Sequence, residues 1–113
     1  MMNNNLFNEI SSTIVRDINP EKIILFGSYA RNEQTPDSDL DIMIILKNDS
    51  MQMHSKIKAI SSIRKSLMNI NVPKDILVFF ETEIDEWKNS KNHIISRALN
   101  DGLCIYERSK ACS

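Results

Sequence analysis

The chain has 113 residues, of which 42% are hydrophobic and 26% charged, and its formal net charge is −1. This length fits one domain over 1–113, with 1–5 and 108–113 expected as loose tails. The charge balance argues against direct binding of nucleic-acid backbones, which favours a basic excess. The sequence shows no run of about 18 apolar residues and no signal-peptide pattern, so we expect a cytoplasmic protein that does not enter a membrane.

The first half of the chain alternates between helical and strand-like patterns. Apolar residues recur at helical spacing until Asn19-Pro20, and a short apolar run then ends at Gly27. A second apolar run follows Asp41 and is apolar on both faces, which is typical of a covered, central strand. In chain order we expect a helix, a strand, a short helix and a strand, over residues 6–18, 22–26, 28–33 and 40–46.

The second half repeats this alternation. Val72-Pro73 ends one long amphipathic pattern and Asp101-Gly102 ends another. The expected elements are a helix, a strand, a helix and a strand, over residues 51–70, 76–80, 84–100 and 103–106. This order predicts the α/β (α+β) class, with one small sheet and about four helices packed against it.

The most informative motif is Gly27-Ser28 followed, after ten residues, by Asp39-x-Asp41. Side chains two apart on a strand point to the same face, so the two carboxylates converge and their repulsion calls for a cation. A glycine-serine pair at a strand-to-helix turn offers backbone N–H groups to a phosphate. Together these are the parts that hold a metal–nucleotide complex.

Carboxylates in this arrangement favour Mg²⁺, which prefers oxygen ligands and is commonly shared with substrate phosphates. Two such ions can act on the attacking and leaving oxygens of a nucleotidyl transfer. A third carboxylate is then needed, and Asp75, at the start of the third strand, is preferred because the second strand also carries its acids at its beginning. The alternatives lie at the other end of that strand: Glu81, Glu83 and Asp85.

Competing interpretations of the same residues are weaker or remain open. A calcium loop would need glycine and glutamate where Ile42 and Asn48 stand. Ser28 can cap a helix as well as meet a phosphate. Arg31 can bind a phosphate or pair with Glu33 or with Asp37. The two cysteines and two histidines show no zinc-site spacing.

The composite motif resembles the signature of the DNA polymerase beta-like nucleotidyltransferase superfamily, and especially its minimal nucleotidyltransferase (MNT) branch. The segment from His93 to Glu107 is similar to the closing helix, glycine and strand of that branch, so the resemblance covers most of residues 20–107. It implies a nucleotidyltransferase fold, a small mixed sheet flanked by helices. One departure is Asn32, where relatives often carry glycine.

The resemblance also implies roles for individual residues. ATP would be the donor, with its triphosphate held by Ser28 beside Gly27 and Arg31. Two Mg²⁺ ions would be bound by Asp39 and Asp41. A third acid, Asp75, would bind the catalytic ion and help to deprotonate the acceptor.

The acceptor is the least defined part, because the chain adds almost nothing to the catalytic core. In the MNT branch the partner is often a HEPN-domain ribonuclease toxin, so the resemblance implies an antitoxin that transfers AMP to a toxin tyrosine. Two alternatives stay open. The protein could neutralise its toxin by binding alone, or it could be a stand-alone transferase for a small molecule or a nucleic acid.

Overall fold

The computed structural model describes residues 4–48 and 52–108, without the side chains of 4 and 52–54. Among these residues no helix is long and apolar enough to cross a membrane. The elements, in chain order, are α1 (Asn4–Ile18), β1 (Lys22–Phe26), β2 (Leu40–Leu46), α2 (Gln52–Ser66), β3 (Lys74–Phe80), α3 (Glu81–Trp87), α4 (Ile94–Asp101) and β4 (Leu103–Glu107). Four helices and four strands agree with the predicted class.

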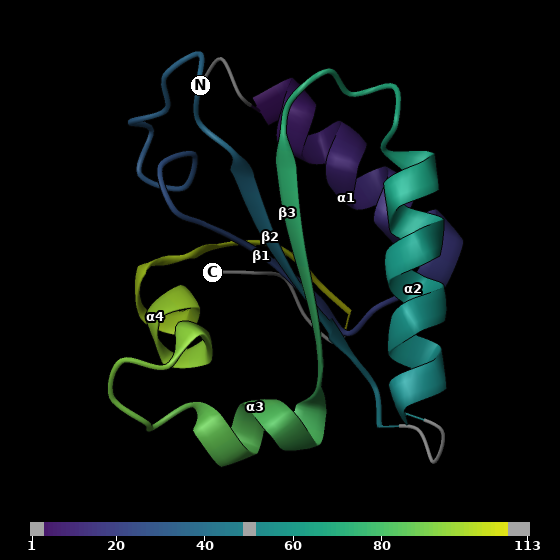
Figure 1. The fold of residues 1–113 in the computed structure, drawn as a ribbon, viewed down its shortest axis with the longest axis vertical. Helices are drawn as coiled ribbons and strands as arrows, with labels where there is room; N and C mark the ends of the chain where they lie inside the picture. Colours follow the sequence, from purple (N-terminus) through teal and green to yellow (C-terminus); the bar gives the residue numbers. More distant parts are fainter. Residues whose placement is uncertain (1–3, 49–51, 109–113) are drawn as a thin grey trace.

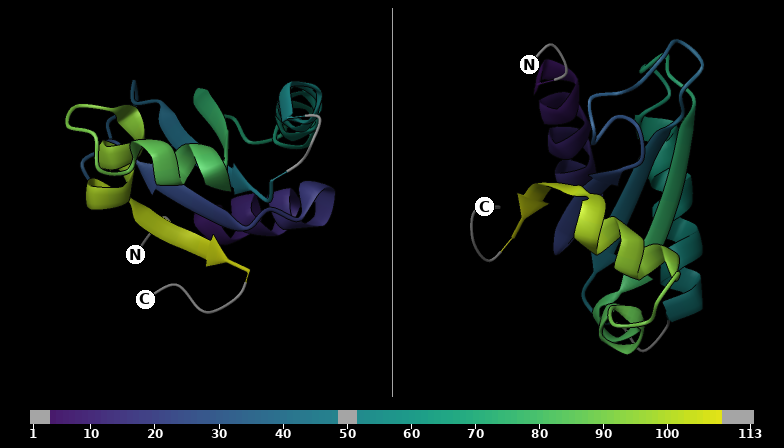
Figure 2. Two further views of the ribbon diagram at one scale, coloured as in Figure 1. Left: turned by 90° about the horizontal axis from the view of Figure 1, so that it is seen from below. Right: turned by 90° about the vertical axis from the view of Figure 1, so that its left-hand side faces the viewer.

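The four strands form one mixed sheet in the order β3-β2-β1-β4. β2 and β3 run parallel, whereas β1 is antiparallel to both of its neighbours, β2 and β4. Figure 1 shows α1 and α2 on one side of the sheet and α3 and α4 on the other, and Figure 2 shows the same layers from two further directions. The predicted fold class, a mixed sheet flanked by helices, is confirmed.

Alternate residues of β1 and β2 supply two separate cores. On one face the strand residues pack with α1 and α2; the fully buried members include Ile10, Ile14, Ile23, Leu25, Ile42, Ile44, Ile63 and Leu67. On the other face a smaller cluster joins the strands to α4; its buried members are Ile24, Met43, Ile45, Ile95 and Ala98. Because strand side chains alternate, Asp41 lies on the face of Met43 and Ile45, the one that α4 covers. Both central strands are therefore covered, as the apolar pattern after Asp41 predicts for β2.

The prediction of a short helix over 28–33 is wrong, because the segment forms consecutive turns instead. Arg31 N–H donates to the Gly27 carbonyl at 3.3 Å, and Glu33 N–H donates to the Ser28 carbonyl at 2.9 Å. The backbone has φ of 75° at Gly27 and 56° at Asn32. These left-handed positions bracket the segment and prevent repeated right-handed helical dihedrals.

The prediction of a single helix over 84–100 is also wrong, because α3 and α4 are separate helices. Between them Asn92 has φ of 67°, and His93 caps α4 by accepting a hydrogen bond from Ile95 N–H at 3.1 Å. The rings of Trp87 and His93 stack with centroids 4.6 Å apart. The local capping geometry therefore outweighs the apolar spacing that suggested one continuous helix.

The other boundaries shift by a few residues. β3 begins at Lys74, so Asp75 lies inside the strand, and α2 ends at Ser66. Of the segments predicted to be loose, 4–5 belong to α1, and Arg108 N–H donates to the Glu21 carbonyl at 2.9 Å, beside an ion pair between the same residues. The rest of the predicted tails, 1–3 and 109–113, lie outside the described residues.

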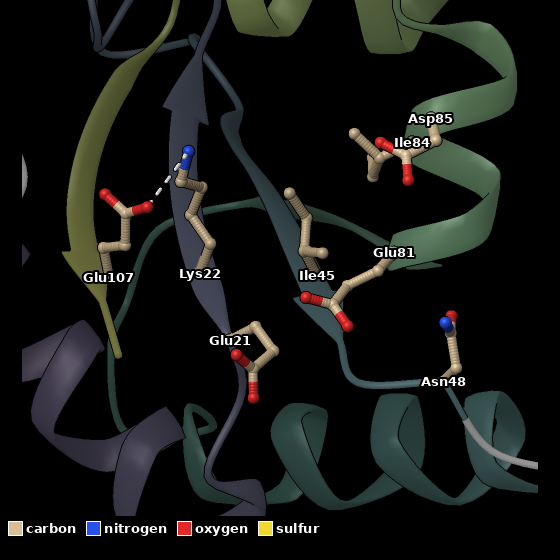
Figure 3. A pocket seen from close by; sticks show the side chains of 8 residues that line it. All are labelled: Glu21, Lys22, Ile45, Asn48, Glu81, Ile84, Asp85 and Glu107. Atoms are coloured by element: carbon tan, nitrogen blue, oxygen red, sulfur yellow. Dashed lines mark ion pairs between the residues drawn. The ribbon is translucent and has the colours of Figure 1, made fainter. Parts of the chain in front are cut away.

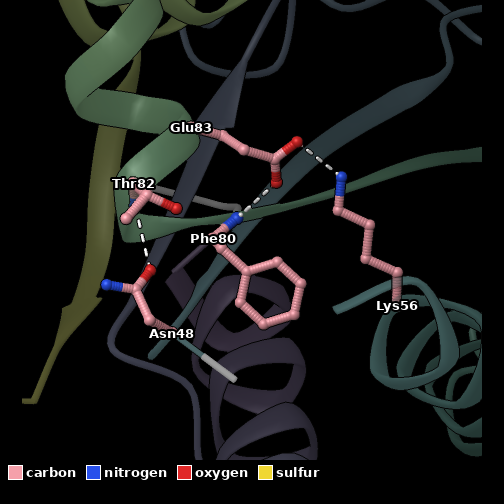
Figure 4. Close-up of polar contacts among 5 residues, drawn as sticks. All are labelled: Asn48, Lys56, Phe80, Thr82 and Glu83. Atoms are coloured by element: carbon pink, nitrogen blue, oxygen red, sulfur yellow. Dashed lines mark hydrogen bonds and ion pairs between the residues drawn. The ribbon is translucent and has the colours of Figure 1, made fainter. Parts of the chain in front are cut away.

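Polar contacts fix the start of α3 at the end of β3 (Figure 4). Glu83 accepts from Phe80 N–H at 2.9 Å and pairs with Lys56 of α2 at 2.8 Å. Thr82 N–H donates to Asn48 Oδ1 at 3.0 Å. Glu83, one of the alternatives for the third acid, is thus used to join α2 to α3.

Ser96 is buried beneath the α3–α4 connection and stabilises it. Its hydroxyl lies 2.8 Å from the Trp87 carbonyl oxygen, 3.0 Å from that of Lys88 and 2.6 Å from that of Ser90. We expect Ser96→Ala to lower the free energy of unfolding by about 1–2 kcal/mol, because the connection loses its buried donor. Urea denaturation measures this loss. Ser61→Ala, at an exposed position of α2, is the control, and equal stability of the two variants would contradict the assignment.

Candidate active site

The end of β1 lies beside the starts of β2 and β3, where Gly27, Asp41 and Asp75 come together. We call this side of the sheet the motif edge. The antiparallel register pairs Phe26 with Asp41, and the parallel register pairs Asp41 with Asp75. The two aspartates are therefore neighbours across adjacent strands, about 4.8 Å apart along the sheet, and both point to the α4 face. Glu81 and Asp85 lie at the opposite end of β3. The parallel pairing of β2 and β3 is what brings the preferred third acid, rather than its alternatives, to Asp41.

Gly27 follows the last residue of β1 and lies directly beside Asp41. Two observations explain why this position has no side chain. Its φ of 75° is disfavoured for residues with a Cβ atom. A Cβ built on Gly27 would also overlap the Asp41 carboxylate at Oδ2. The glycine of the motif therefore allows the backbone turn to approach the central carboxylate closely.

The carboxylates influence one another electrostatically. Burial raises the pKa of Asp41 above its ordinary value, the charges of Asp75 and then Asp39 raise it further, and Arg31 opposes these effects. Asp41 is half-buried, whereas Asp39 and Asp75 are exposed. A bound cation would offset this repulsion.

The donor set suits Mg²⁺, because all three groups are carboxylates and Mg²⁺ prefers oxygen ligands. Asp41 and Asp75 are paired in register, and Asp39 lies close enough to influence Asp41. Within residues 4–48 and 52–108, however, no three acidic, histidine or cysteine side chains are grouped tightly enough to enclose a metal. The three carboxylates therefore form an open set that does not by itself enclose a metal ion.

The turn after β1 offers backbone donors beside these acids. The N–H groups of Arg31, Asn32 and Glu33 donate to carbonyls within the turn, whereas those of 28–30 have no acceptor among the described residues. The phosphate-binding interpretation therefore depends on a turn and not on the helix that was expected. Arg31 pairs with Glu33 at 2.9 Å, so of its two possible acidic partners Glu33 is the one observed.

A cavity of about 230 Å³ lies beside Asp41. Its lining comprises Phe26, Gly27, Arg31, Asp41, Ile94, Arg97 and Asp101. It thus combines the turn, the central acid and one face of α4. Arg97 is the residue that sequence reasoning missed, since its helix was interpreted as core only. The position of Arg97 in the helical pattern does not indicate that this side of α4 lies next to the Gly27-Ser28 motif.

A second cavity, of about 360 Å³, lies at the far end of the sheet (Figure 3). Its acidic lining residues are Glu21, Glu81, Asp85 and Glu107. The Lys22 ammonium in its wall pairs with Glu107 at 3.7 Å. Excess negative charge opposes a triphosphate, so this cavity does not compete with the motif edge as a nucleotide site.

Comparisons with known proteins identify relatives of this chain. One similar protein of Methanocaldococcus jannaschii, MJ0141, is named for a proposed protein adenylyltransferase activity; it is 39% identical over 57 residues, which are 50% of this chain and 57% of that protein. MJ0604 of the same organism, named likewise, is 64% identical over 25 residues, which are 22% of this chain and 25% of that protein. The matched segments thus span about half and a quarter of these relatives.

Solved structures share the fold. A nucleotidyltransferase crystal structure from Sulfolobus solfataricus superposes with a TM-score of 0.60 and 24% identity, covering 94% of this chain and 81% of that one. A toxin–antitoxin structure with AMP-PNP gives a TM-score of 0.59 and 17% identity, covering 91% of this chain and 74% of that one. A mutant MntA–HpeT toxin–antitoxin structure gives 0.58, also at 17% identity, with the same coverage.

The family comparison covers nearly the whole chain. The family described as "Polymerase beta, Nucleotidyltransferase" matches residues 8–111, which include the complete Gly27-Ser28 and Asp39-x-Asp41 motif as well as Asp75. The resemblance inferred from the sequence is therefore confirmed, and the chain belongs to the polymerase beta nucleotidyltransferase family.

Proposed function

We propose that this protein is a Mg²⁺-dependent nucleotidyltransferase that transfers AMP from ATP to a tyrosine of a cognate HEPN ribonuclease toxin, and so acts as its antitoxin. The observation that carries the proposal is the pairing of Asp41 with Asp75 next to Gly27, at the edge where the family motif lies. The names of the two relatives support protein adenylylation, and the toxin–antitoxin neighbours support the partner class. Such a protein would work in the cytoplasm, with ATP and its toxin.

Under this proposal Asp39, Asp41 and Asp75 would hold the metal ions. When bound, Mg²⁺ would neutralise phosphate charge and favour ionisation of the acceptor hydroxyl. The open donor set leaves positions for phosphate oxygens. The exposed Asp75 side chain is accessible to a residue of another protein.

The remaining chemistry belongs to the chain's own groups. The tyrosine oxygen forms a bond to the α-phosphorus of ATP, and the bond from that phosphorus to the pyrophosphate oxygen breaks. Asp75 accepts the phenolic proton, and pyrophosphate leaves with the electron pair. The turn over 28–30, with the Ser28 hydroxyl, supplies donors for the phosphates.

The test incubates the protein with ATP labelled at the α-phosphate, Mg²⁺ and the product of the adjacent gene. We expect label on a tyrosine of that partner, located by mass spectrometry, and no label after chelation of the metal. Asp75→Asn should slow transfer at least about 100-fold, because proton acceptance by a positioned group contributes about 10²–10⁴-fold. Asp85→Asn, at the far end of the sheet, is the matched control.

Two other results would replace the proposal. If wild-type protein protects cells from the toxin without labelling it, neutralisation is by binding alone. If it consumes ATP with a small molecule or a nucleic acid and needs no protein partner, it is a stand-alone transferase.

A further inference from the structure

Arg97 belongs to α4 and lines the cavity beside Gly27 and Asp41. Ile95 and Ala98 bury α4 against the sheet, whereas Arg97 is exposed. Ile94, Arg97 and Asp101 are spaced by three and four residues, so they form one stripe along the helix. All three line the cavity that also contains Gly27 and Asp41. Arg97 and the turn of the motif therefore line the same cavity.

Arg97 has no partner of its own in the part of the chain that the structure describes. Its side chain makes no hydrogen bond or ion pair with any of the described residues, 4–48 and 52–108, although Asp101 follows one helical turn later. By contrast, Arg31 on the opposite wall is already paired with Glu33. Arg97 is thus a cation available to a ligand in this cavity.

The position of the cavity indicates which part of a nucleotide would reach Arg97. The lining includes Gly27 and Asp41 but neither Asp39 nor Asp75, so the cavity lies on the β1 side of the central acid. The acceptor is expected near Asp75, on the β3 side. In an in-line displacement the leaving group departs opposite the attacking oxygen. The β- and γ-phosphates would therefore extend toward the cavity.

We propose that Arg97 contacts the β- or γ-phosphate of the bound nucleotide and the pyrophosphate that is released. This rests on the proposed function and adds a residue to it. The planar guanidinium can donate two parallel hydrogen bonds to phosphate oxygens, a geometry that lysine cannot reproduce. Asp101, beside it on the same stripe, disfavours a phosphate at the end of the helix and so limits the contact to the motif side of the cavity.

The experiment measures binding of Mg²⁺-AMP-PNP and of Mg²⁺-AMP by isothermal titration calorimetry, with no acceptor present. We expect Arg97→Gln to weaken AMP-PNP binding about tenfold or more and to leave AMP binding within about twofold of wild type. Arg97→Lys should recover part of the loss. The control is Arg64→Gln, which removes the same charge from an exposed position of α2 on the other side of the sheet and should bind as wild type does.

Three results would overturn this inference while leaving the proposed function intact. They are unchanged AMP-PNP binding by Arg97→Gln, an equal loss of AMP and AMP-PNP binding, and an equal loss in Arg64→Gln. In the first of these cases, slower transfer by the same variant would assign Arg97 to the acceptor instead. If wild-type protein binds neither nucleotide, the proposed function itself fails, so the two failures are distinguishable.

Discussion

Asp41→Asn should abolish AMP transfer, lowering its rate at least about 10³-fold, while the protein keeps its fold. Asp41 lies between the turn of the motif and Asp75, and it is the acid that burial and both neighbouring carboxylates affect. Loss of metal-based charge stabilisation worth several kcal/mol corresponds to a rate change of this size, since each 1.36 kcal/mol is tenfold. The labelled-ATP transfer assay measures it.

The same substitution has an opposite expected effect on stability without metal. Because the folded protein raises the pKa of Asp41, the stability that its protonated form contributes is present below the unfolded pKa and is lost as the pH rises through the folded pKa. Asparagine does not titrate, so the variant should lack this loss and be at least as stable as wild type near pH 7. Urea denaturation at pH 4 and pH 7 in the presence of a chelator tests this.

Asp37→Asn is the control for both measurements, because Asp37 is exposed in the loop before β2. It should transfer AMP and unfold as wild type does. An active Asp41→Asn protein would contradict the assignment of the central acid. An inactive variant that is also unfolded would instead make Asp41 a structural residue.

Gly27→Ala should lower both stability and activity. An alanine would hold the disfavoured φ of 75°, and its Cβ would overlap the Asp41 carboxylate. The left-handed backbone alone costs about 1–2 kcal/mol, and the overlap adds to this cost. Thermal or urea denaturation should therefore show a loss of about 2 kcal/mol or more, and transfer by the folded fraction should fall at least about tenfold because the carboxylate is displaced.

Gly102→Ala separates these two effects. A Cβ at Gly102 would overlap the Ala98 carbonyl oxygen and the Ile24 side chain, but the backbone φ of −82° is open to alanine. This variant should lose stability yet keep transfer activity in its folded fraction. Equal activity per folded molecule in both glycine variants would show that Gly27 does not position Asp41.

The strands could be predicted from the sequence because they follow local rules. Apolar runs of strand length next to turn-forming residues predict all four strands. Strand periodicity predicts that Asp39 and Asp41 share a face, but β2 begins at Leu40, so of the two only Asp41 lies within the strand. Asp75 required an assumption about strand direction, which the parallel register of β2 and β3 satisfies. The strand predictions depend on patterns within a few residues.

The predictions were wrong or incomplete where the structure depends on backbone dihedral angles or on packing between residues far apart in the sequence. The turns over 28–33 depend on left-handed dihedrals at Gly27 and Asn32, which composition alone does not specify. The division between α3 and α4 depends on Asn92 and on the His93 cap. Arg97 could not be found because its proximity to Gly27 exists only after α4 has packed on the sheet.

The pairing of the first strand with the last has a consequence for synthesis of the protein. β4 adds to β1 with Lys22 opposite Glu107, so this side of the sheet closes only after β4 has been made. Closing so long a segment is entropically costly and late. On the ribosome Asp41 and Asp75 are therefore made well before α4, and a nascent or truncated chain would contain the proposed metal ligands without the cavity that Arg97 lines.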